Sequence, residues 1–383
     1  MLIKRTLQDK ILERITTKGK SRKVIIIYGA RRVGKTTLVK EILSASDLKK
    51  QYFNCDYLDV QSAFSYENAG NLESLVRNLD LIVLDEAQRI KNIGMVLKIL
   101  HDEFPHLQVI ATGSSSFELS GQINEPLTGR KVIYQLFPFT MEELAQGRSK
   151  IESDRLLNRV LRFGSYPPVI LEDDTTALEN LNEIASSYLF KDILAFQQLR
   201  KPDLLLDLLK LLAFQVSGEV SYTELSRKLS TDQTVIQRYI QLLEDNFIVF
   251  RLQALRKNLR TEVGKSRKIY FWDLGIRNIL IQNTNVLDSR DDQGKLWENF
   301  CISERMKFLR YQQLSPVNSY FWRIYDQKEI DYIEEEANKY KAFEFKWSAG
   351  KIKKPPQEFM HAYPNHEMIT VNPDNYTDVL YNN

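Results

Sequence analysis

The chain is poor in cysteine and has no long apolar run among its 383 residues. Its two cysteines, Cys55 and Cys301, stand far apart and form no CxxC pair, so we interpret both as reduced thiols, in the core or on the surface, of a cytoplasmic protein. No stretch approaches the roughly 20 apolar residues that a bilayer-spanning helix needs. The charged, amphipathic start MLIKRTLQDKILERI is not a signal peptide. We therefore expect no membrane partner.

Net charge is also small, because 53 Lys and Arg face 50 Asp and Glu and leave only +3. Proteins that coat nucleic acid without sequence preference are usually more basic, so any DNA contact must come from local basic patches. The chain has no low-complexity tract and no internal repeat. Its 43% hydrophobic and 27% charged residues are typical of a globular protein, and its length indicates two or three domains.

The first third of the chain alternates strands with helices. The apolar run VIIIY at 24–28 predicts a buried parallel strand, followed by a glycine-rich turn and the helical segment TTLVKEILSAS. Further strands are predicted at 51–56, 81–84 and 108–112, with helices between them at 71–78 and 94–103. This order predicts an α/β fold with a doubly wound parallel sheet, helices on both faces, that ends near 132–139.

The rest of the chain changes pattern twice. Residues 141–212 are nearly all helical, apart from a turn at the GSYPP motif of 164–168. A helix–turn–helix and a hairpin follow within 203–272. After residue 290 the helix LWENFCISERMKFL precedes the strands SYFWRIY, EIDYIEEE and YKAFEFKW, which form an α/β module of their own. We therefore predict three domains, at 1–145, 146–285 and 286–383.

The turn after the first strand carries a phosphate-binding motif, GARRVGKT, which fits G-x-x-x-x-G-K-[ST] between a strand and a helix. Glycines let the backbone approach phosphate oxygens, and the helix N-terminus presents free N–H groups to the anion. Lys35 should reach the β- and γ-phosphates, and Thr36 should ligate Mg²⁺. The motif predicts that ATP and Mg²⁺ bind at Gly29, Ala30, Arg31, Arg32, Val33, Gly34, Lys35, Thr36 and Thr37.

A later apolar strand, LIVL, runs into Asp85 and then Glu86. A carboxylate at such a strand end can hold Mg²⁺ through water, which is the role predicted for Asp85. Glu86 is placed to act as general base on the attacking water. Taken alone, the acidic pair could merely cap the next element, but after a phosphate-binding loop the catalytic interpretation is favoured.

Other positions bear on the same nucleotide. Thr112 or Ser114, in the segment ATGSS, could sense the γ-phosphate, although a loop that needs small turn residues explains both equally well. Arg130 is a catalytic candidate that would stabilise charge on the transferring phosphoryl group, in its own chain or from a neighbouring subunit. A solvated arginine is the alternative. Arg31 and Arg32 either contact phosphate or face solvent.

Residues 221–272 have a winged-helix pattern. Ser221 is the predicted N-cap of a short helix with Glu224 in the capping-box position, and a second helix spans 232–246. Strands at 248–255 and 268–272 flank a basic wing. In the DNA-binding interpretation the second helix enters a groove and the wing contacts phosphates, whereas a winged helix that only joins domains is the alternative. The candidate DNA contacts are Gln237, Arg238, Arg256, Lys257, Arg260, Lys265 and Arg267.

Chemistry-bearing residues gather in the predicted C-terminal hairpin. Asp331 ends one strand, and alternation puts Glu344 and Lys346 on one face of the next, where Asp331 can meet them. An Asp, a Glu and an adjacent Lys suit metal-assisted phosphodiester hydrolysis, and Glu298 on the preceding helix is a candidate extra ligand. Ordinary surface salt bridges are the alternative interpretation.

Several motifs occur here in order: GARRVGKTT, LIVLDEAQRI, IATGSSS, LTGRKVIYQLFPFTMEEL, GSYPPVI, YLFKDIL, KIYFWDLGIRN and EIDYIEEE…AFEFKW. Together they resemble the prokaryotic AAA-family ATPases whose C-terminal half is a domain of unknown function 4143, over nearly the whole chain. The resemblance implies an ASCE-type P-loop NTPase domain whose nucleotide site is matched by Lys35, Thr36, Asp85 and Glu86. It also implies a winged helix and then a PD-(D/E)XK nuclease-like domain, similar to the restriction-endonuclease core, onto which map Asp331, Glu344 and Lys346. AAA-type lids are not evident, which leaves ring formation open.

The resulting hypothesis is an Mg²⁺-dependent ATPase that uses hydrolysis to act on DNA through the winged helix and the nuclease-like domain. The alternative is a nucleotide-gated switch in defence or toxin–antitoxin biology, whose C-terminal domain binds a protein partner and has no nuclease activity. A role for Arg130 between subunits would require a homo-oligomer. A steep loss of DNA affinity with rising salt is expected only under the first hypothesis.

Overall fold

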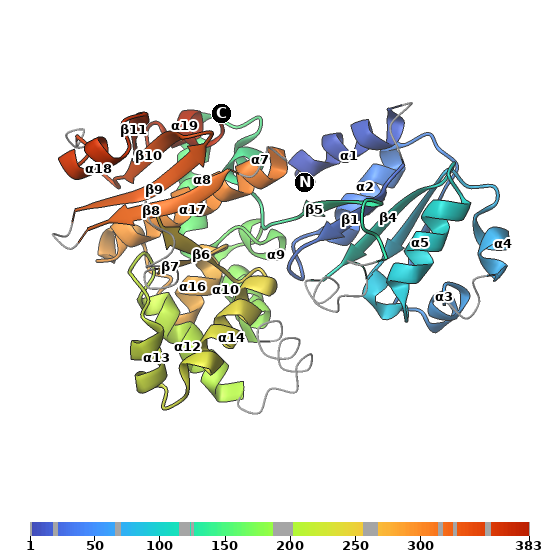
Figure 1. The fold of residues 1–383 in the computed structure, drawn as a ribbon, viewed down its shortest axis with the longest axis horizontal. Helices are drawn as coiled ribbons and strands as arrows, with labels where there is room; N and C mark the ends of the chain where they lie inside the picture. Colours follow the sequence, from blue (N-terminus) through green and yellow to red (C-terminus); the bar gives the residue numbers. More distant parts are fainter. Residues whose placement is uncertain are drawn as a thin grey trace. The chain divides into compact units, whose positions relative to one another are not determined.

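The computed structural model describes residues 2–17, 22–65, 70–114, 123, 126–186, 202–255, 267–312, 317–324, 328–348 and 354–382 (Figure 1). The chain forms two compact units, Met1–Phe139 with Asp245–Phe247, and Thr140–Glu244 with Ile248–Asn383. Within the described parts of the chain, no helix has the length and apolar content that a bilayer crossing requires.

The first unit is built on a five-stranded sheet with the order β2-β3-β4-β1-β5, in which every neighbouring pair is parallel. Its strands are β1 (Val24–Tyr28), β2 (Lys50–Asn54), β3 (Leu81–Asp85), β4 (Gln108–Gly113) and β5 (Lys131–Gln135). The helices of this unit are α1 (Thr6–Thr16), α2 (Lys35–Ala45), α3 (Leu58–Ala63), α4 (Leu72–Val76) and α5 (Ile93–Glu103), with the short 3₁₀ turn η2 (Ala87–Arg89). The predicted α/β fold with a parallel sheet flanked by helices is confirmed.

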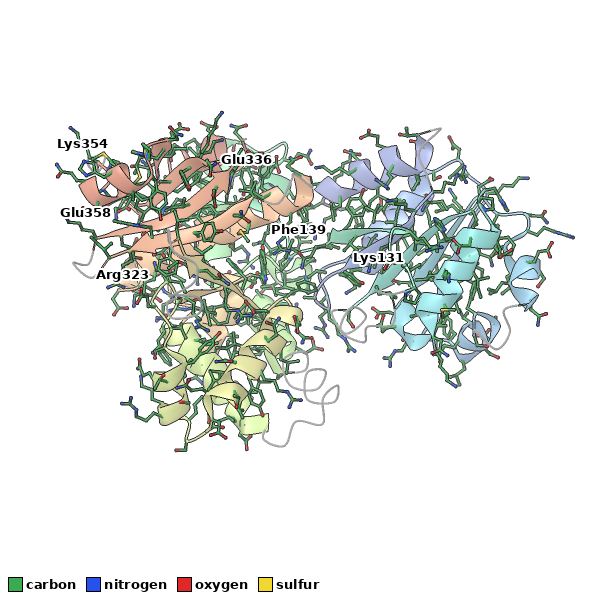
Figure 2. The ribbon with its side chains drawn as sticks, viewed as in Figure 1. Lys131, Phe139, Arg323, Glu336, Lys354 and Glu358 are labelled. Atoms are coloured by element: carbon green, nitrogen blue, oxygen red, sulfur yellow. The ribbon has the colours of Figure 1, made fainter. Side chains whose placement is uncertain are left out.

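Burial in this sheet follows the apolar runs of the sequence. Every residue of β1, β3 and β4 is buried, because these strands are covered on both faces. The two edge strands are partly exposed, and β5, which starts at Lys131 (Figure 2), is shorter than the apolar run that predicted it. Since all five strands are parallel, their carboxyl ends share one sheet edge, where ligands of such folds bind.

The second unit begins with helices, as predicted. They are α7 (Met141–Ala145), α8 (Lys150–Phe163), α9 (Pro167–Ile170), α10 (Asp174–Glu183) and α12 (Pro202–Phe214), and α16 (Leu274–Leu280) packs against α8. The turn of the GSYPP motif has a tertiary reason. Gly164 has φ +77°, and a Cβ there would lie 2.0 Å from Asp273 Oδ1. The Asp273 carboxylate accepts from the Ser165 N–H (2.7 Å) and caps α16 through the Ile276 N–H (3.2 Å).

Two short helices and a hairpin lie where the winged-helix pattern put them. The elements are α13 (Tyr222–Lys228), α14 (Gln233–Asp245), β6 (Val249–Ala254) and β7 (Arg267–Phe271), and the two strands pair antiparallel. Ser221 caps α13 by accepting from the Glu224 N–H (3.3 Å). Along α14, Ile236, Ile240 and Leu243 are buried, while Gln237 and Arg238 are exposed as predicted.

The hairpin is also part of a larger, mixed sheet with the order β11-β10-β9-β8-β6-β7. The remaining strands are β8 (Asn318–Arg323), β9 (Glu329–Glu336), β10 (Lys339–Phe345) and β11 (His366–Val371). The helices beside them are α17 (Gln293–Gln312), α18 (Gln357–Ala362) and α19 (Tyr376–Leu380), with η4 (Leu287–Ser289) before α17. Strand β6 joins this sheet by pairing parallel with β8, at Gln253↔Tyr320 and Ala254↔Phe321.

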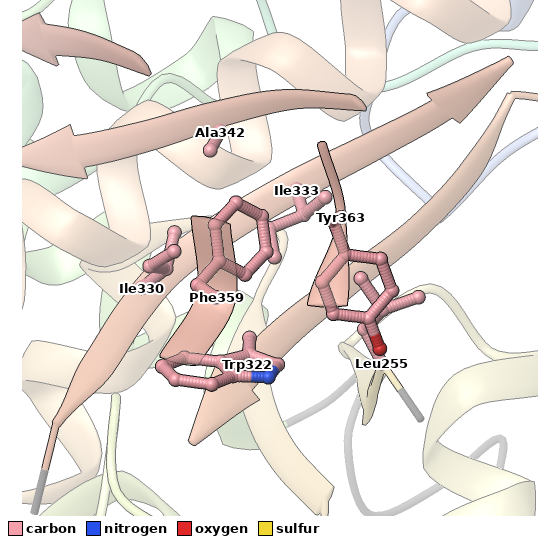
Figure 3. Packing of buried hydrophobic residues seen from close by; sticks show 7 residues of the cluster. All are labelled: Leu255, Trp322, Ile330, Ile333, Ala342, Phe359 and Tyr363. Atoms are coloured by element: carbon pink, nitrogen blue, oxygen red, sulfur yellow. The ribbon is translucent and has the colours of Figure 1, made fainter. Parts of the chain in front are cut away.

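The predicted boundary after residue 285 therefore does not separate two compact units. One sheet crosses it, and residues from both sides share one apolar cluster (Figure 3). Leu255, just after β6, packs in this cluster with side chains from β8, β9, β10, α18 and the residue after α18. These are Trp322, Ile330, Ile333, Ala342, Phe359 and Tyr363. The physical reason is that a two-stranded hairpin is rarely stable alone and gains stability from a neighbouring strand and a covered face.

Candidate functional site

The loop between β1 and α2 has the backbone geometry of a phosphate cradle. A Cβ at Gly29 would lie 2.2 Å from Leu136 O, so only glycine fits. Gly34 has φ +96° and Arg32 φ +61°, which turn the chain sharply into α2. Gly34 is the N-cap of that helix and offers no side-chain cap, so the first N–H groups of α2 are left to a ligand.

Lys35 begins α2 and is 5% exposed. Its Nζ donates to Gly29 O and Ala30 O, both at 2.9 Å, within the loop itself. Burial lowers the pKa of Lys35 to about 8, while Glu86 and Asp85 oppose the shift and Arg31 adds to it. The lysine is thus held over the loop, next to two carboxylates from β3 and its end.

Three hydroxyl groups converge on the Asp85 carboxylate at the carboxyl end of β3. Thr36 Oγ1 donates to Oδ2 (2.7 Å), the Tyr52 hydroxyl donates to the same oxygen (2.6 Å), and Thr112 Oγ1 donates to Oδ1. The predicted Mg²⁺ ligands Thr36 and Asp85 are therefore in direct contact. The side-chain oxygens of this pair are the hard ligands that Mg²⁺ prefers.

Glu86 lies one residue beyond, in the left-handed region at φ +55°. Its N–H donates to Thr112 Oγ1 (3.1 Å), and the Gln88 side chain donates to Glu86 Oε2. Of the two sensor candidates, Thr112 thus contacts both acidic residues, while Ser114 is buried just beyond β4.

Arg130 lies at the amino-terminal ends of the parallel strands, away from the carboxyl ends that the phosphate loop follows. Its carbonyl accepts from the Val24 N–H (2.9 Å) at the start of β1, whereas the phosphate loop follows the end of that strand. A strand of this length separates the two ends by about 13 Å. The Arg130 side chain also pairs with Asp102 (2.8 Å) at the end of α5. Action of Arg130 on the phosphates of its own chain, one of the two roles predicted for it, is therefore wrong; the role between subunits stays a prediction.

Tyr52 and Gln88 were missed from the sequence. Tyr52 stands on β2, two residues before Asn54, which pairs in register with Asp85. Alternation along a strand puts residues two apart on the same face, so the register of β2 against β3 would have indicated Tyr52. The sequence alone does not state that register.

Three family models match successive parts of the chain. Residues 21–145 match the family model described as an AAA domain, residues 154–287 match domain of unknown function 8612, and residues 293–380 match domain of unknown function 4143. The chain carries an AAA domain and a domain of unknown function 4143. The resemblance drawn from the motifs is thereby confirmed.

Relatives of this AAA protein occur in bacteria and archaea. The uncharacterized protein Rv2008c of Mycobacterium tuberculosis is 27% identical over 327 residues, which cover 84% of this chain and 70% of the relative. An uncharacterized protein of Haemophilus influenzae is 22% identical and covers 90% of this chain and 88% of its own length. Among solved structures, the Thermotoga maritima RuvB Holliday junction branch migration motor matches 65% of this chain and 90% of its own, with 18% identity and a TM-score of 0.33.

A polar groove of about 600 Å³ lies over α14 of this AAA protein and the neighbouring hairpin. It is lined by Tyr222, Thr234, Gln237, Arg238, Gln241, Arg251 and Arg267. Arg267 stacks over the Tyr222 ring, 3.7 Å from its centroid, and Arg251 donates to the Tyr222 hydroxyl (3.2 Å) and pairs with Glu244. Three predicted DNA contacts thus line one groove. The other four, Arg256, Lys257, Arg260 and Lys265, lie outside the described residues.

In the domain of unknown function 4143, the four predicted C-terminal residues come together. Lys346 Nζ lies 2.7 Å from Glu344 Oε1, and Asp331 Oδ2 accepts from the Phe345 N–H (2.8 Å). Glu298, on α17, stands close enough to Asp331 to raise its pKa. Glu298, Glu329 and Asp331 each offer an oxygen within 4.8 Å of the others.

Three cluster residues were missed: Glu329, two residues before Asp331 on β9, and Lys268 and Tyr270, which come from β7, a strand distant in sequence. Lys268 Nζ lies 2.9 Å from Glu298 Oε1 and also contacts Glu329. The Tyr270 hydroxyl donates to the same Glu298 oxygen (2.7 Å). Alternation puts Lys268 and Tyr270 on one strand face, but only the sheet order reveals what that face meets.

Electrostatics in this cluster favours fewer negative charges. Burial raises the pKa of Glu298, and burial together with Glu298 and Glu344 raises that of Asp331 well above its usual range. For Lys268, burial works against the charge, but Glu298, Glu329 and Asp331 outweigh it and raise its pKa. The Lys268 ammonium therefore stays charged among carboxylates that repel one another.

Proposed function

We propose that this AAA protein is an Mg²⁺-dependent ATPase. The observation that carries the proposal is the direct contact between Thr36 and Asp85, with Lys35 over the loop beside them. The glycine that a Cβ would block and the uncapped start of α2 suit phosphate oxygens. Thr36 and Asp85 would hold Mg²⁺, directly or through water. When bound, the ion neutralises charge on the phosphates.

The chain's own residues account for the remaining roles. Glu86 accepts a proton from the attacking water. Thr112 and Gln88 hold Glu86 in place by hydrogen bonds. Lys35 exchanges its two carbonyl partners for phosphate oxygens, which are stronger acceptors for an ammonium group. Residues 29–37 supply the backbone N–H groups. Hydrolysis to ADP and phosphate follows from an activated water next to a bound nucleotide.

Arg130 enters the proposal only between subunits. Its position at the sheet edge away from the loop leaves the phosphates of a second copy as its target. We therefore propose that the active form is a homo-oligomer in which Arg130 of one copy approaches the nucleotide of the next.

We further propose that the groove over α14 contacts DNA, in the manner of a winged helix. Gln237 and Arg238 are exposed on the outer face of α14, and Arg267 adds a cation from the adjoining strand. Guanidinium and amide groups on one helix face suit phosphate and base-edge contacts. Two buried free thiols, Cys55 and Cys301, are compatible with a cytoplasmic location.

Stimulation of ATP hydrolysis by DNA tests the proposal. The rate is measured with single strands, duplexes and branched DNA, at low and moderate salt. We expect stimulation that weakens steeply with salt, because phosphate contacts release counterions. A rate unaffected by every DNA would instead support the nucleotide-gated switch with a protein partner. Metal-assisted cleavage of DNA in the C-terminal domain is a separate question, since it requires a divalent ion among carboxylates that already hold Lys268.

A further inference from the structure

Lys268 occupies the centre of the carboxylate cluster. Its side chain is 2% exposed, and its ammonium group lies between Glu298, which is 15% exposed, and Glu329, which is 25% exposed. Lys268 Nζ also stands 5.6 Å from the centroid of the Phe321 ring. A lysine is almost never buried to this degree unless its charge is paired, and here two carboxylates pair with it.

The carboxylates of the cluster also form further hydrogen bonds and ion pairs. Glu298 Oε1 accepts from both Lys268 and Tyr270. Glu329 has a second cation, because Arg323 Nη1 lies 3.6 Å from its Oε2 (Figure 2 labels Arg323 at the end of β8). Asp331 accepts a backbone N–H, and Glu344 pairs with Lys346. Each carboxylate that a divalent ion would need already has a protein donor.

The backbone fixes the position of Lys268. Strand β7 pairs with β6 from Val249↔Phe271 to Gln253↔Arg267, with Lys268 opposite Leu252. On the other edge of β7, Lys268 forms an isolated bridge with Glu219. Contacts on both sides of the strand hold the ammonium over the carboxylates, so a metal ion could enter only by displacing a buried, doubly paired cation.

We propose that the Lys268 ammonium is the resident cation of this cluster and excludes divalent metal from it. The proposal narrows the role of the C-terminal unit to binding, without metal-dependent cleavage of DNA. It goes beyond the proposed ATPase and DNA-binding functions and does not depend on either. Removing the ammonium should leave Glu298, Glu329 and Asp331 with excess negative charge and oxygens within 4.8 Å of one another, which suits a divalent ion.

Titration of Mn²⁺ into the nucleotide-free full chain tests this directly. All proteins carry Asp85→Asn, so that the nucleotide site contributes no metal. The parent, which carries Asp85→Asn and an intact Lys268, should show no saturable Mn²⁺ site. Lys268→Met and Lys268→Gln should gain one saturable site that binds Mn²⁺ about tenfold or more tighter than any residual binding by the protein with Lys268, the scale on which groups around metal ligands act. Lys268→Arg retains a cation and should gain none.

Adding Asp331→Asn to Lys268→Met should abolish the gained site, which locates it in the cluster. Circular dichroism identifies the variants that fold, and Lys268→Gln serves if Lys268→Met does not. The proposal is overturned if the parent binds Mn²⁺ at a site that Asp331→Asn removes, a result that needs no Lys268 variant. A folded Lys268→Met or Lys268→Gln protein that gains no site also overturns it.

A cleavage assay supplies a second readout. With Lys268 present, supercoiled plasmid should stay intact in Mg²⁺ or Mn²⁺. Nicking that is lost in Asp331→Asn would overturn the proposal and establish metal-assisted hydrolysis instead. ATP turnover and DNA binding are measured on the same protein without Asp85→Asn, so a failure of the ATPase or DNA proposal is seen separately.

Discussion

The Tyr52 hydroxyl lies 2.6 Å from Asp85 Oδ2, the oxygen that also accepts from Thr36. The burial of Tyr52 and the charge of Asp85 raise the pKa of this hydroxyl, so it remains a donor at every physiological pH. A residue from the edge strand β2 thus orients the carboxylate at the end of the neighbouring strand β3. We infer that Tyr52 is a positioning residue for the metal ligand.

Replacement of Tyr52 by Phe should lower ATP turnover and raise the Mg²⁺ concentration needed for half-maximal rate, with ATP binding nearly unchanged. Loss of one hydrogen bond to a charged group costs about 1.5–3 kcal/mol, so we expect a drop of roughly tenfold or more. Mg²⁺ titrations of the steady-state rate measure it. Tyr57→Phe, at an exposed tyrosine nearby in sequence, is the matched control. An unchanged Mg²⁺ requirement would remove Tyr52 from this role.

The affinity for ATP should be level below about pH 8 and fall above it, by up to about tenfold per pH unit. The reason is that burial lowers the pKa of Lys35 to about 8 and that ATP binds the protonated ammonium more tightly than the neutral amine. Because the proton is lost as pH rises, affinity falls in that direction. Fluorescent ATP titrations across this range measure it, with Lys98→Ala as the control. Lys35→Ala should lack tight binding at every pH, and a level profile for the unmodified protein would contradict the assignment.

Glu86→Gln should keep ATP binding and stop turnover, because the amide cannot accept the proton of the attacking water. General-base catalysis is worth about 10²–10⁴-fold, and we expect a loss in that range. Binding and single-turnover rates measured on one preparation separate the two effects. Glu103→Gln, at the end of α5, controls for the loss of one negative charge. Normal turnover in Glu86→Gln would assign the base to another residue.

Arg238→Ala should weaken DNA binding and lower the slope of log affinity against log salt by about one, the signature of a lost phosphate contact. Arg238 is exposed on α14 and lines the groove, so its removal should leave the fold intact. Fluorescence anisotropy at several salt concentrations measures the slope. Lys339→Ala, on β10 and outside the groove, is the control. Equal slopes for Arg238→Ala and the unmodified protein would exclude the groove as the DNA contact.

Arg130→Ala should lose most ATP turnover in an oligomer and regain part of it when mixed with Lys35→Ala. In the mixture some sites combine an intact loop from one copy with Arg130 from the other, and an arginine supplied in trans is worth about 10³–10⁵-fold. Asp102→Asn, which removes the Arg130 ion pair and the charge facing His101 but keeps the arginine, should retain turnover. The rate of the mixture is compared with the two variants alone. A mixture no faster than their average would leave Arg130 a structural residue of the sheet edge.

The contacts of the candidate phosphate loop could be predicted largely from the sequence because its parts are local. The strand, the glycine turn, Lys35 and Thr36 are contiguous, and the next carboxylates end a strand of the same parallel sheet, whose carboxyl ends share one edge. That Glu344 and Lys346 share one strand face was likewise predicted, since alternation along one strand is a local rule, and the structure joins the two as an ion pair.

Residues contributed by strands that are distant in sequence could not be predicted in this way. Alternation predicts which residues share a face, but not which strand will lie opposite, so the approaches of Tyr52 to Asp85 and of Lys268 to Glu298 were not foreseen. The same reasoning failed for Arg130. Its motif suggested proximity to the phosphates, but Arg130 precedes β5 and therefore lies at the amino-terminal ends of the parallel strands. The glycine-rich turn, the acidic pair after β3 and the α/β class could be predicted because they depend on contiguous segments. Strand order alone decided that the hairpin joins the C-terminal sheet and brings Lys268 among the carboxylates, since pairing between distant strands depends on packing of the whole unit.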